Sequence, residues 1–130
     1  MVRVEYGTYT NKIPITKAKN ITDAIDIKAG KNHTVILKST GEVYVTGSNL
    51  YGELGQNDVN IRKTKEFTKV PGLRDIVKIG TGDSQNLALK SDGTVMTWGS
   101  NIYKQLGIGS NETSIRTTYK GAKPTKHPIY

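Results

Sequence analysis

The chain has 130 residues and a net charge of +8; 35% of the residues are apolar, fourteen are glycine and none is cysteine. A chain of this length forms one domain, and the absence of cysteine excludes disulfides and thiolate metal sites. His33 and His127 are the only histidines, so we expect no metal site, and we expect no cofactor. No apolar run is long enough for a membrane span or a signal peptide, so we expect no membrane partner. We therefore expect a soluble protein of the cytoplasm or of a virion.

Short strands separated by turns are predicted along the chain, because apolar and polar residues alternate with a period of two. In chain order, the expected strands are residues 24–30, 33–39, 43–47, 75–80, 85–91 and 95–99, and the looser stretch 64–70 could add an outer fourth strand. The turn "SDGT" at 91–94 is typical of a hairpin, since Gly93 can adopt a positive φ. Residues 49–55 and 101–107 are the only segments that could form a helical turn.

The chain repeats itself with a period of 52 residues. Without a gap, 14 of the 36 positions from 20 to 55 are identical to their partners from 72 to 107, and "TGSNLYGELG" returns as "WGSNIYKQLG". Such a period indicates a repeat architecture in which each unit is one supersecondary element. We expect a single repeat domain, 1–130, composed of a partial repeat or connecting segment (1–18), repeat 1 (19–70), repeat 2 (71–122) and a basic C-terminal tail (123–130).

Residues 20–55 and 72–107 resemble the repeat of the regulator of chromosome condensation family, whose units of about fifty residues stack as blades of a β-propeller. The resemblance rests on eleven positions of the first unit: Gly30, His33, Leu37, Gly41, Val43, Gly47, Ser48, Asn49, Tyr51, Leu54 and Gly55. Three positions depart from the pattern, because Thr46 stands in place of tryptophan, Gln85 in place of histidine and Lys104 in place of glycine. A kelch propeller has a similar period, but it requires a Gly-Gly doublet that this chain lacks.

The resemblance implies an all-β fold, with two blades of a β-propeller made of short antiparallel strands. Two blades alone leave apolar faces exposed, because each unit of a repeat protein buries its face against its neighbours. We therefore expect the propeller to be completed by homo-oligomerisation or by a larger partner, with three chains giving six blades or four giving eight. The alternative is that the chain is a piece of a longer protein.

Motifs that carry catalysis are missing from the sequence. There is no "GxSxG" elbow around Ser84 and no phosphate-binding "GK[ST]". Asp23 and Asp75 occupy the same place in the two repeats, so a shared turn is favoured over a pair of acid–base carboxylates. His33 is expected to form structural hydrogen bonds, since Gln85, which cannot act as a general base, takes its place in the second repeat.

The loops that differ most between the repeats are the predicted partner-binding surface, because propellers usually bind through the loops at the ends of their blades. The candidate partner-binding residues are Lys31, Asn32, His33, Asp83, Ser84, Gln85, Tyr51, Tyr103 and Lys104. The flanking basic segments "RKTK" (62–65) and "RTTYKGAKPTK" (116–126) are a second choice. Within them, a candidate polyanion-binding set consists of Arg116, Lys120, Lys123 and Lys126.

These observations favour a non-enzymatic module for protein–protein interaction or assembly, with no catalytic residue. One alternative is a basic module that binds nucleic acid or another polyanion, and another is a structural component of a larger particle, such as a viral tail or a cell surface. The resemblance implies diverse protein partners, among them chromatin with a small GTPase. Richness in Lys, Ile, Asn and Thr favours a bacterial or phage source.

Overall fold

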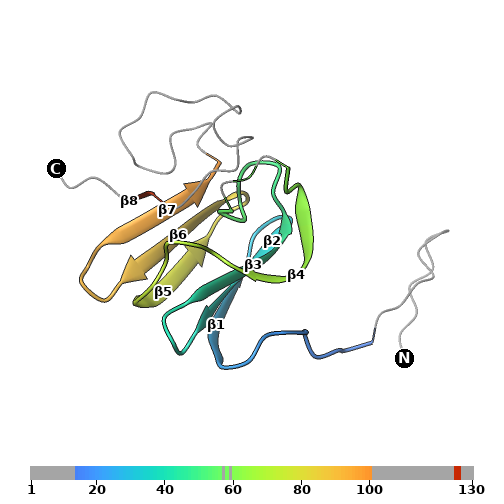
Figure 1. Cartoon of the computed structure of the whole chain (residues 1–130), viewed down its shortest axis with the longest axis horizontal. Coiled ribbons are helices and arrows are strands. Elements are labelled where there is room, and N and C mark those ends of the chain that lie inside the picture. Colours follow the sequence, from blue (N-terminus) through green and yellow to red (C-terminus); the bar gives the residue numbers. More distant parts are fainter. Residues whose placement is uncertain (1–13, 57, 59, 101–124, 127–130) are drawn as a thin grey trace.

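The computed structural model describes residues 14–56, 58 and 60–100 and the backbone of residues 125–126 (Figure 1). Two four-stranded antiparallel sheets lie side by side, each with its strands in chain order. The first sheet, blade 1, contains β1 (Ala24–Ala29), β2 (His33–Lys38), β3 (Val43–Ser48) and β4 (Lys63–Lys69). The second, blade 2, contains β5 (Ile76–Thr81), β6 (Gln85–Lys90), β7 (Val95–Gly99) and β8 (Thr125–Lys126).

The predicted all-β fold with two propeller blades is confirmed. Six of the eight strands coincide with the segments in which apolar and polar residues alternate, within one or two residues at each end, and β4 lies at the looser stretch 64–70. The eighth, β8, pairs with β7 through Met96 and Thr97, and it comes from the segment expected to be a basic tail. In the part of the chain that the structure describes there is no helix, and so none that is long and apolar enough to cross a membrane.

Residues 49–55, which could form a helical turn, form a series of hydrogen-bonded turns that the side chain of Asn49 organises. Its Nδ2 donates to the carbonyl oxygen of Ile61 at 2.6 Å, and its Oδ1 accepts the amide of Leu54 at 3.0 Å. Asn49 is buried, and Leu54 is fully buried in the core. The repeated "GSN…LG" sequence therefore fixes a loop and places the Leu54 side chain in the core. The corresponding segment 101–107 lies outside the described residues.

The hydrophobic core lies between the two blades. Since alternate side chains of a strand point to opposite faces of the sheet, one face of blade 1 packs on one face of blade 2. Blade 1 contributes Val35, Leu37, Val43 and Val45, and blade 2 contributes Ile76, Ile79, Ala88 and Trp98, with Leu54, Val70 and Leu73 from the connecting segments. β5 of the second blade contacts both β1 and β2 of the first. Each blade therefore buries the apolar side chains of one face against its neighbour.

The blades share irregularities that follow from the repeat. β1 bulges between Ala24 and Asp26, and β5 bulges at the equivalent place between Ile76 and Lys78. Asp23 and Asp75 precede these strands with φ of 61° and 60°, and their carbonyl oxygens accept the amides of Ser39 and Ser91. The two aspartates thus have the shared turn role that their equivalent positions indicate.

Gly47 and Gly99 allow the chain to pass close to the preceding loop at the end of each inner hairpin. Their φ angles are 110° and 106°, and a Cβ atom would collide with the carbonyl oxygen of Asn32 or of Ser84. The following amides, of Ser48 and Ser100, donate to those same carbonyl oxygens at 2.8 Å. A side chain at either glycine would therefore break a backbone contact that both repeats use.

We predict that Gly47→Ala and Gly99→Ala each lower the free energy of unfolding by about 2 kcal/mol or more, because both conformation and space exclude a Cβ atom. Urea unfolding measures the change. Gly72→Asn is the matched control: Gly72 has a φ of 80° with open space around it, and its repeat equivalent, Asn20, adopts a φ of 62°. An equal loss of unfolding free energy in all three variants would contradict the close approach of Gly47 and Gly99 to the preceding loops.

Candidate functional site

A buried polar cluster joins the two blades at the start of β2 and β6. The Nε2 atom of His33 lies 2.8 Å from Oδ1 of Asn86, and both side chains are buried. Nδ2 of Asn86 and Nε1 of Trp98 both donate to the carbonyl oxygen of Glu53, at 2.8 and 2.9 Å. The hydrogen bonds thus connect a strand and a loop of blade 1 to two strands of blade 2. His33 has the structural role predicted for it, with a partner in the other blade.

The carboxyl group of Glu53 lies in the same buried region, with the residue only 2% exposed. Its Oε1 accepts the amide of Tyr51 at 2.7 Å. Burial raises the pKa of this carboxyl, while hydrogen bonds from the amides of Glu53 and Tyr51 and the proximity of His33 act in the opposite direction. A carboxylate at neutral pH therefore costs folding free energy at this position.

The loops before β2 and β6 lie side by side at one end of the blades, which we call the loop rim (residues 30–33 and 82–85). The amide of Lys31 donates to the carbonyl oxygen of Asp83 at 3.0 Å, so the two loops are joined by backbone. Lys31, Asn32 and Asp83 are exposed. The rim therefore presents a cation, an amide and a carboxylate close together on a rigid support.

The predicted partner-binding residues divide into three groups. Lys31, Asn32 and Asp83 are exposed on the loop rim, with Ser84 half-buried beside them. His33 is buried between the blades, and the half-buried Gln85 side chain lies over Gly82. Half-buried Tyr51 lies in the β3–β4 connection, and Tyr103 and Lys104 lie outside the described residues.

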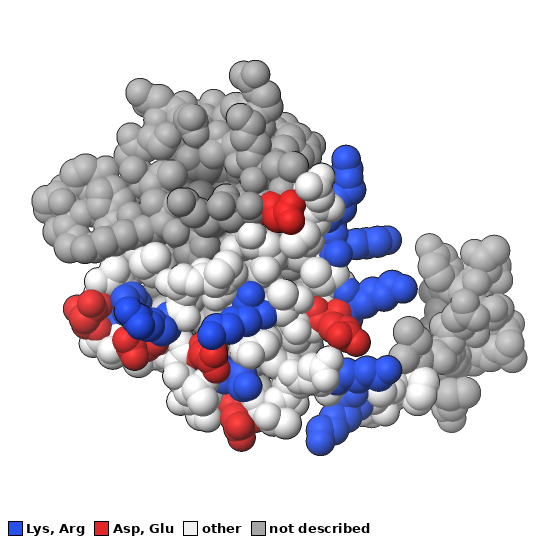
Figure 2. Space-filling view, in the orientation of Figure 1, with Lys and Arg blue, Asp and Glu red and all other residues white. Residues whose placement is uncertain are grey.

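The side chains of the predicted polyanion-binding residues lie outside the part of the chain that the structure describes. Arg116, Lys120 and Lys123 lie outside the described residues, and only the backbone of Lys126, in β8, is described. A different basic surface is visible along β4, the outer edge of blade 1. Its exposed cations Arg62, Lys63 and Lys65 form no ion pair within the described part of the chain. Figure 2 shows basic side chains projecting along this edge of the molecule.

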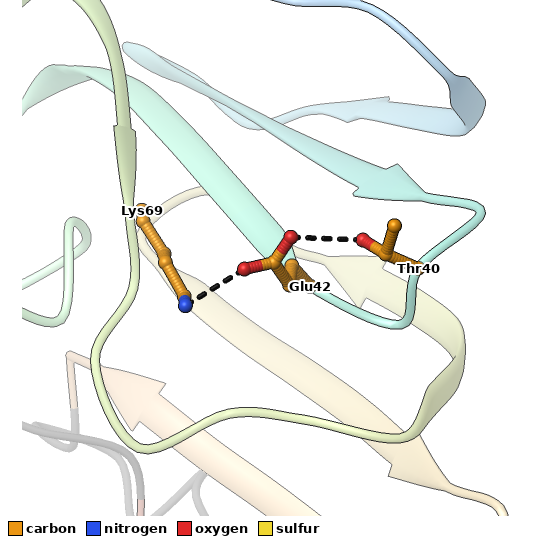
Figure 3. Close-up of polar contacts among 3 residues, drawn as sticks. All are labelled: Thr40, Glu42 and Lys69. Atoms are coloured by element: carbon orange, nitrogen blue, oxygen red, sulfur yellow. Dashed lines mark hydrogen bonds and ion pairs between the residues drawn. The ribbon is translucent and has the colours of Figure 1, made fainter.

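The opposite end of the blades, the hairpin rim (residues 39–42 and 91–94), carries a small ionic contact. Nζ of Lys69 lies 2.7 Å from Oε2 of Glu42, whose Oε1 accepts a hydrogen bond from Thr40 at 2.9 Å (Figure 3). The bond from Lys69, followed by that from Thr40, lowers the pKa of the Glu42 carboxyl. Because Lys69 is exposed and Glu42 is only half-buried, this contact contributes little to stability.

The described residues contain no cluster of three or more His, Asp or Glu side chains that could hold a metal ion. Ser84 and His33 both belong to the loop rim, but the described bond of His33 goes to Asn86. What the arrangement offers chemically is a rigid rim of exposed polar groups and a basic edge.

We predict that Glu53→Gln raises the free energy of unfolding by about 1 kcal/mol at pH 7.5, because it removes a buried charge and keeps the acceptor for the Tyr51 amide. A carboxyl group whose pKa is raised in the folded state destabilises the fold above that folded pKa. It has no effect on stability below the pKa of the unfolded chain, which is about 4.3 for glutamate. The stability gained by Glu53→Gln therefore vanishes as the pH falls towards 4. Thermal unfolding between pH 4 and pH 7.5 measures both.

Glu42→Gln is the control variant, and its effect on stability should have the opposite sign, because the pKa of the Glu42 carboxyl is lowered in the folded state. Its contribution is present at neutral pH and disappears as the pH falls through the folded pKa. Glu42→Gln therefore lowers stability at pH 7.5 and has no effect at low pH. The same pH profile for both variants would contradict the burial of the Glu53 charge.

Comparison with known proteins identifies the repeat. The family model described as "Regulator of chromosome condensation (RCC1) repeat" matches residues 24–53 and 76–105, and a second model with the same description matches 92–129. The regulator of chromosome condensation of Xenopus laevis is 36% identical over 99 residues, which is 75% of this chain and 23% of that protein. The human E3 ubiquitin-protein ligase HERC2 is 34% identical over 92 residues, covering 69% of this chain and 2% of the ligase.

Solved structures show the same fold. Yeast RCC1 (Prp20), in its complex with Kap60, superimposes with a TM-score of 0.72 at 20% identity over 88% of this chain and 26% of that one. Human WBSCR16 superimposes with a TM-score of 0.72 at 21% identity over 97% of this chain and 31% of that one. The chain thus spans less than a third of each of these relatives. Its repeats, its two sheets and these matches show that it belongs to the regulator of chromosome condensation (RCC1) repeat family.

Proposed function

We propose that the chain is a non-enzymatic protein-interaction module that binds its partner through the loop rim. The observation that supports this most directly is the rim itself: Lys31, Asn32 and Asp83 are exposed on two loops that are hydrogen-bonded to each other. Strands immediately follow both loops, so little conformational entropy is lost when a partner orders these side chains. The rim is also where the repeats differ, with "KNH" in one and "DSQ" in the other.

The relatives support an interaction role. Yeast Prp20 is known in complex with Kap60, and a second structure of Prp20p is described together with its binding to Gsp1p and histones. Those proteins are several times longer than this chain, so their partners are not transferred to it. What the family supports here is the class of activity, recognition of another protein, and the fold alone does not select the partner.

Site-specific photo-cross-linking in cells that produce the protein tests this proposal. We expect a cross-linkable residue at position 31 or 83 on the loop rim to capture one and the same protein. Positions 39 and 91 on the hairpin rim are the matched controls, because Ser39 and Ser91 are also exposed and occupy equivalent turns of the two repeats. Capture of the partner from positions 39 and 91 alone would contradict the proposal.

The dissociation constant of the complex with the captured partner tests the proposal quantitatively. We predict that Lys31→Ala combined with Asn32→Ala and Asp83→Ala weakens binding by at least about tenfold, or 1.4 kcal/mol. Ser39→Ala combined with Ser91→Ala should leave the dissociation constant within about twofold, since those side chains lie on the opposite rim. The two variants should unfold at the same temperature as the unmodified chain.

A second candidate function is polyanion binding, and the basic edge along β4 favours it. Cations that are not paired with carboxylates are available to phosphate groups, and such binding releases counterions. We predict that the logarithm of the affinity for a duplex DNA falls linearly with the logarithm of the salt concentration. Lys63→Gln with Lys65→Gln should reduce that slope by about two.

Lys28→Gln with Lys78→Gln is the control for the polyanion test. Both lysines are exposed on β1 and β5, away from the basic edge, and the double variant removes the same net charge. An equal reduction of the slope by both double variants would show that net charge alone attracts the DNA. Binding that does not depend on salt would discard this candidate.

A further inference from the structure

The loop rim continues into the start of the basic edge at one end of blade 1. The carbonyl oxygen of Asn32 on the rim accepts the amide of Ser48, the last residue of β3, at 2.8 Å. Ser48 is in turn paired with Lys63, the first residue of β4. Lys31 and Asn32 therefore lie on one side of Ser48, and Arg62 and Lys63 lie on the other. Backbone hydrogen bonds hold the two halves of this surface together.

The surface around Ser48 combines cations with an exposed apolar side chain. We call it the basic corner, and it consists of Lys31, Asn32, Leu50, Arg62 and Lys63. Leu50 is 45% exposed, and its amide donates to Oγ of Ser48 at 3.3 Å, which places it directly after the row. The three cations are exposed, and none of them forms an ion pair within the described part of the chain.

Two acidic side chains lie near the basic corner, but neither forms an ion pair with its cations within the residues that the structure describes. Asp58, in the β3–β4 connection, is half-buried, and its Oδ1 accepts the amide of Asn60 at 2.9 Å. Asp83 belongs to blade 2 and lies across the rim, where its carbonyl oxygen accepts the amide of Lys31. Asp83 therefore bounds the corner on one side, and Lys65 extends its positive charge along β4 on the other.

The rim is exposed whichever side of a blade its neighbour occupies. Blade 1 packs through the face that carries Val35, and blade 2 packs through the opposite face, which carries Ala88. Lys31 is exposed in the first blade, and its repeat equivalent, Asp83, is exposed in the second. Lys63 lies on the outer strand of blade 1 rather than on a face that packs against another blade. The corner is thus a surface at the end and margin of the blade.

We propose that the basic corner binds an acidic segment of the partner protein that carries one large apolar side chain. Exposed cations without carboxylate partners attract an acidic segment and steer its approach, and Leu50 offers an apolar contact beside them. Neighbouring hydrogen-bonded chains are about 4.8 Å apart, so acidic residues about three positions apart in an extended segment would reach both Lys31 and Lys63. Asp83 repels carboxylates, so the acidic part of the segment lies over blade 1.

This inference rests on the proposed function and deepens it, because it names the chemistry of the partner that the loop rim recognises. A nucleic acid could use the same cations, but its phosphates would gain nothing from Leu50. The apolar contact therefore distinguishes an acidic protein segment from a polyanion.

Photo-cross-linking at single positions of the intact chain, with the partner peptide identified by mass spectrometry, tests the proposal. Cross-linkable residues at positions 31, 50 and 63 should all label one segment of one protein, with a net negative charge and a large apolar side chain. Position 77 is the matched control and should not label that segment. Val77 is 49% exposed, and its neighbour Ile76 is hydrogen-bonded to Gly41 on the hairpin rim.

The cross-links separate failure of this inference from failure of the proposed function. Capture of a partner from positions 31 and 83 but not from 50 and 63, or capture of a segment without an excess of acidic residues, would overturn the inference and leave the proposed function standing. Cross-links from position 63 to nucleic acid would overturn it in favour of polyanion binding. Capture from neither rim loop would contradict both proposals.

The dissociation constant for a synthetic peptide of the labelled segment measures the two kinds of contact. Leu50→Ser combined with Lys63→Gln should weaken binding by at least about tenfold, and Leu50→Ser alone by at least about threefold. Val77→Ser combined with Lys78→Gln is the matched control, because it removes the same charge and a similarly exposed apolar side chain near the hairpin rim. That control should bind within about twofold of the unmodified chain.

Thermal unfolding checks that both double variants are folded, since all four positions are exposed. An equal loss of affinity in the two double variants would overturn the proposal. So would an affinity that Leu50→Ser leaves unchanged, because charge alone would then account for the contact. Peptide binding that stays the same between about 50 mM and about 500 mM salt would also overturn it, since salt screens exposed charges.

Discussion

The contact between neighbouring sheets is the interaction on which the rest of this structure depends. A single twisted sheet of four short strands has two faces, and the apolar side chains on a face are buried only when another layer covers it. Here that layer is the next blade, which brings Val35 and Leu37 of one sheet against Ala88 and Trp98 of the other. The turns, bulges and loops of both repeats then serve to hold the sheets at the distance and angle that this packing requires.

Buried polar groups make the contact specific. An apolar surface alone would tolerate sliding of one sheet over the other, whereas the bonds from His33 to Asn86 and from Asn86 and Trp98 to the carbonyl oxygen of Glu53 allow one register. These bonds lie next to the loop rim, so the cluster that fixes the blades also holds the backbone from which the exposed side chains of Lys31 and Asp83 project. The geometry of the candidate binding surface is in this sense a consequence of the packing beneath it.

The strands could be predicted because their alternation and the 52-residue repeat are local and periodic. The buried position of His33 could not be read in the same way: its partner, Asn86, has threonine at the equivalent place of the first repeat, so the pair exists once and leaves no periodic signal. The path of the loop at 49–55 could not be predicted, since the bonds of the Asn49 side chain to Ile61 and Leu54 set its conformation. The basic segment "RKTK" at 62–65 could be recognised in the sequence, but its position along β4, at the margin of blade 1, depends on the order of the strands in the sheet.

Native-state hydrogen exchange of the amides in β2 and β6, in the unmodified chain and in Asn86→Ala, tests the central claim most directly. If the two sheets are stable only as a pair, these amides exchange through one common opening. Removing Asn86 leaves the His33 ring without its partner, at a cost of about 1–3 kcal/mol, and should lower the opening free energy of both strands by the same amount. A loss of protection in β6 with β2 unchanged would show that the blades are stable separately, and it would contradict this account.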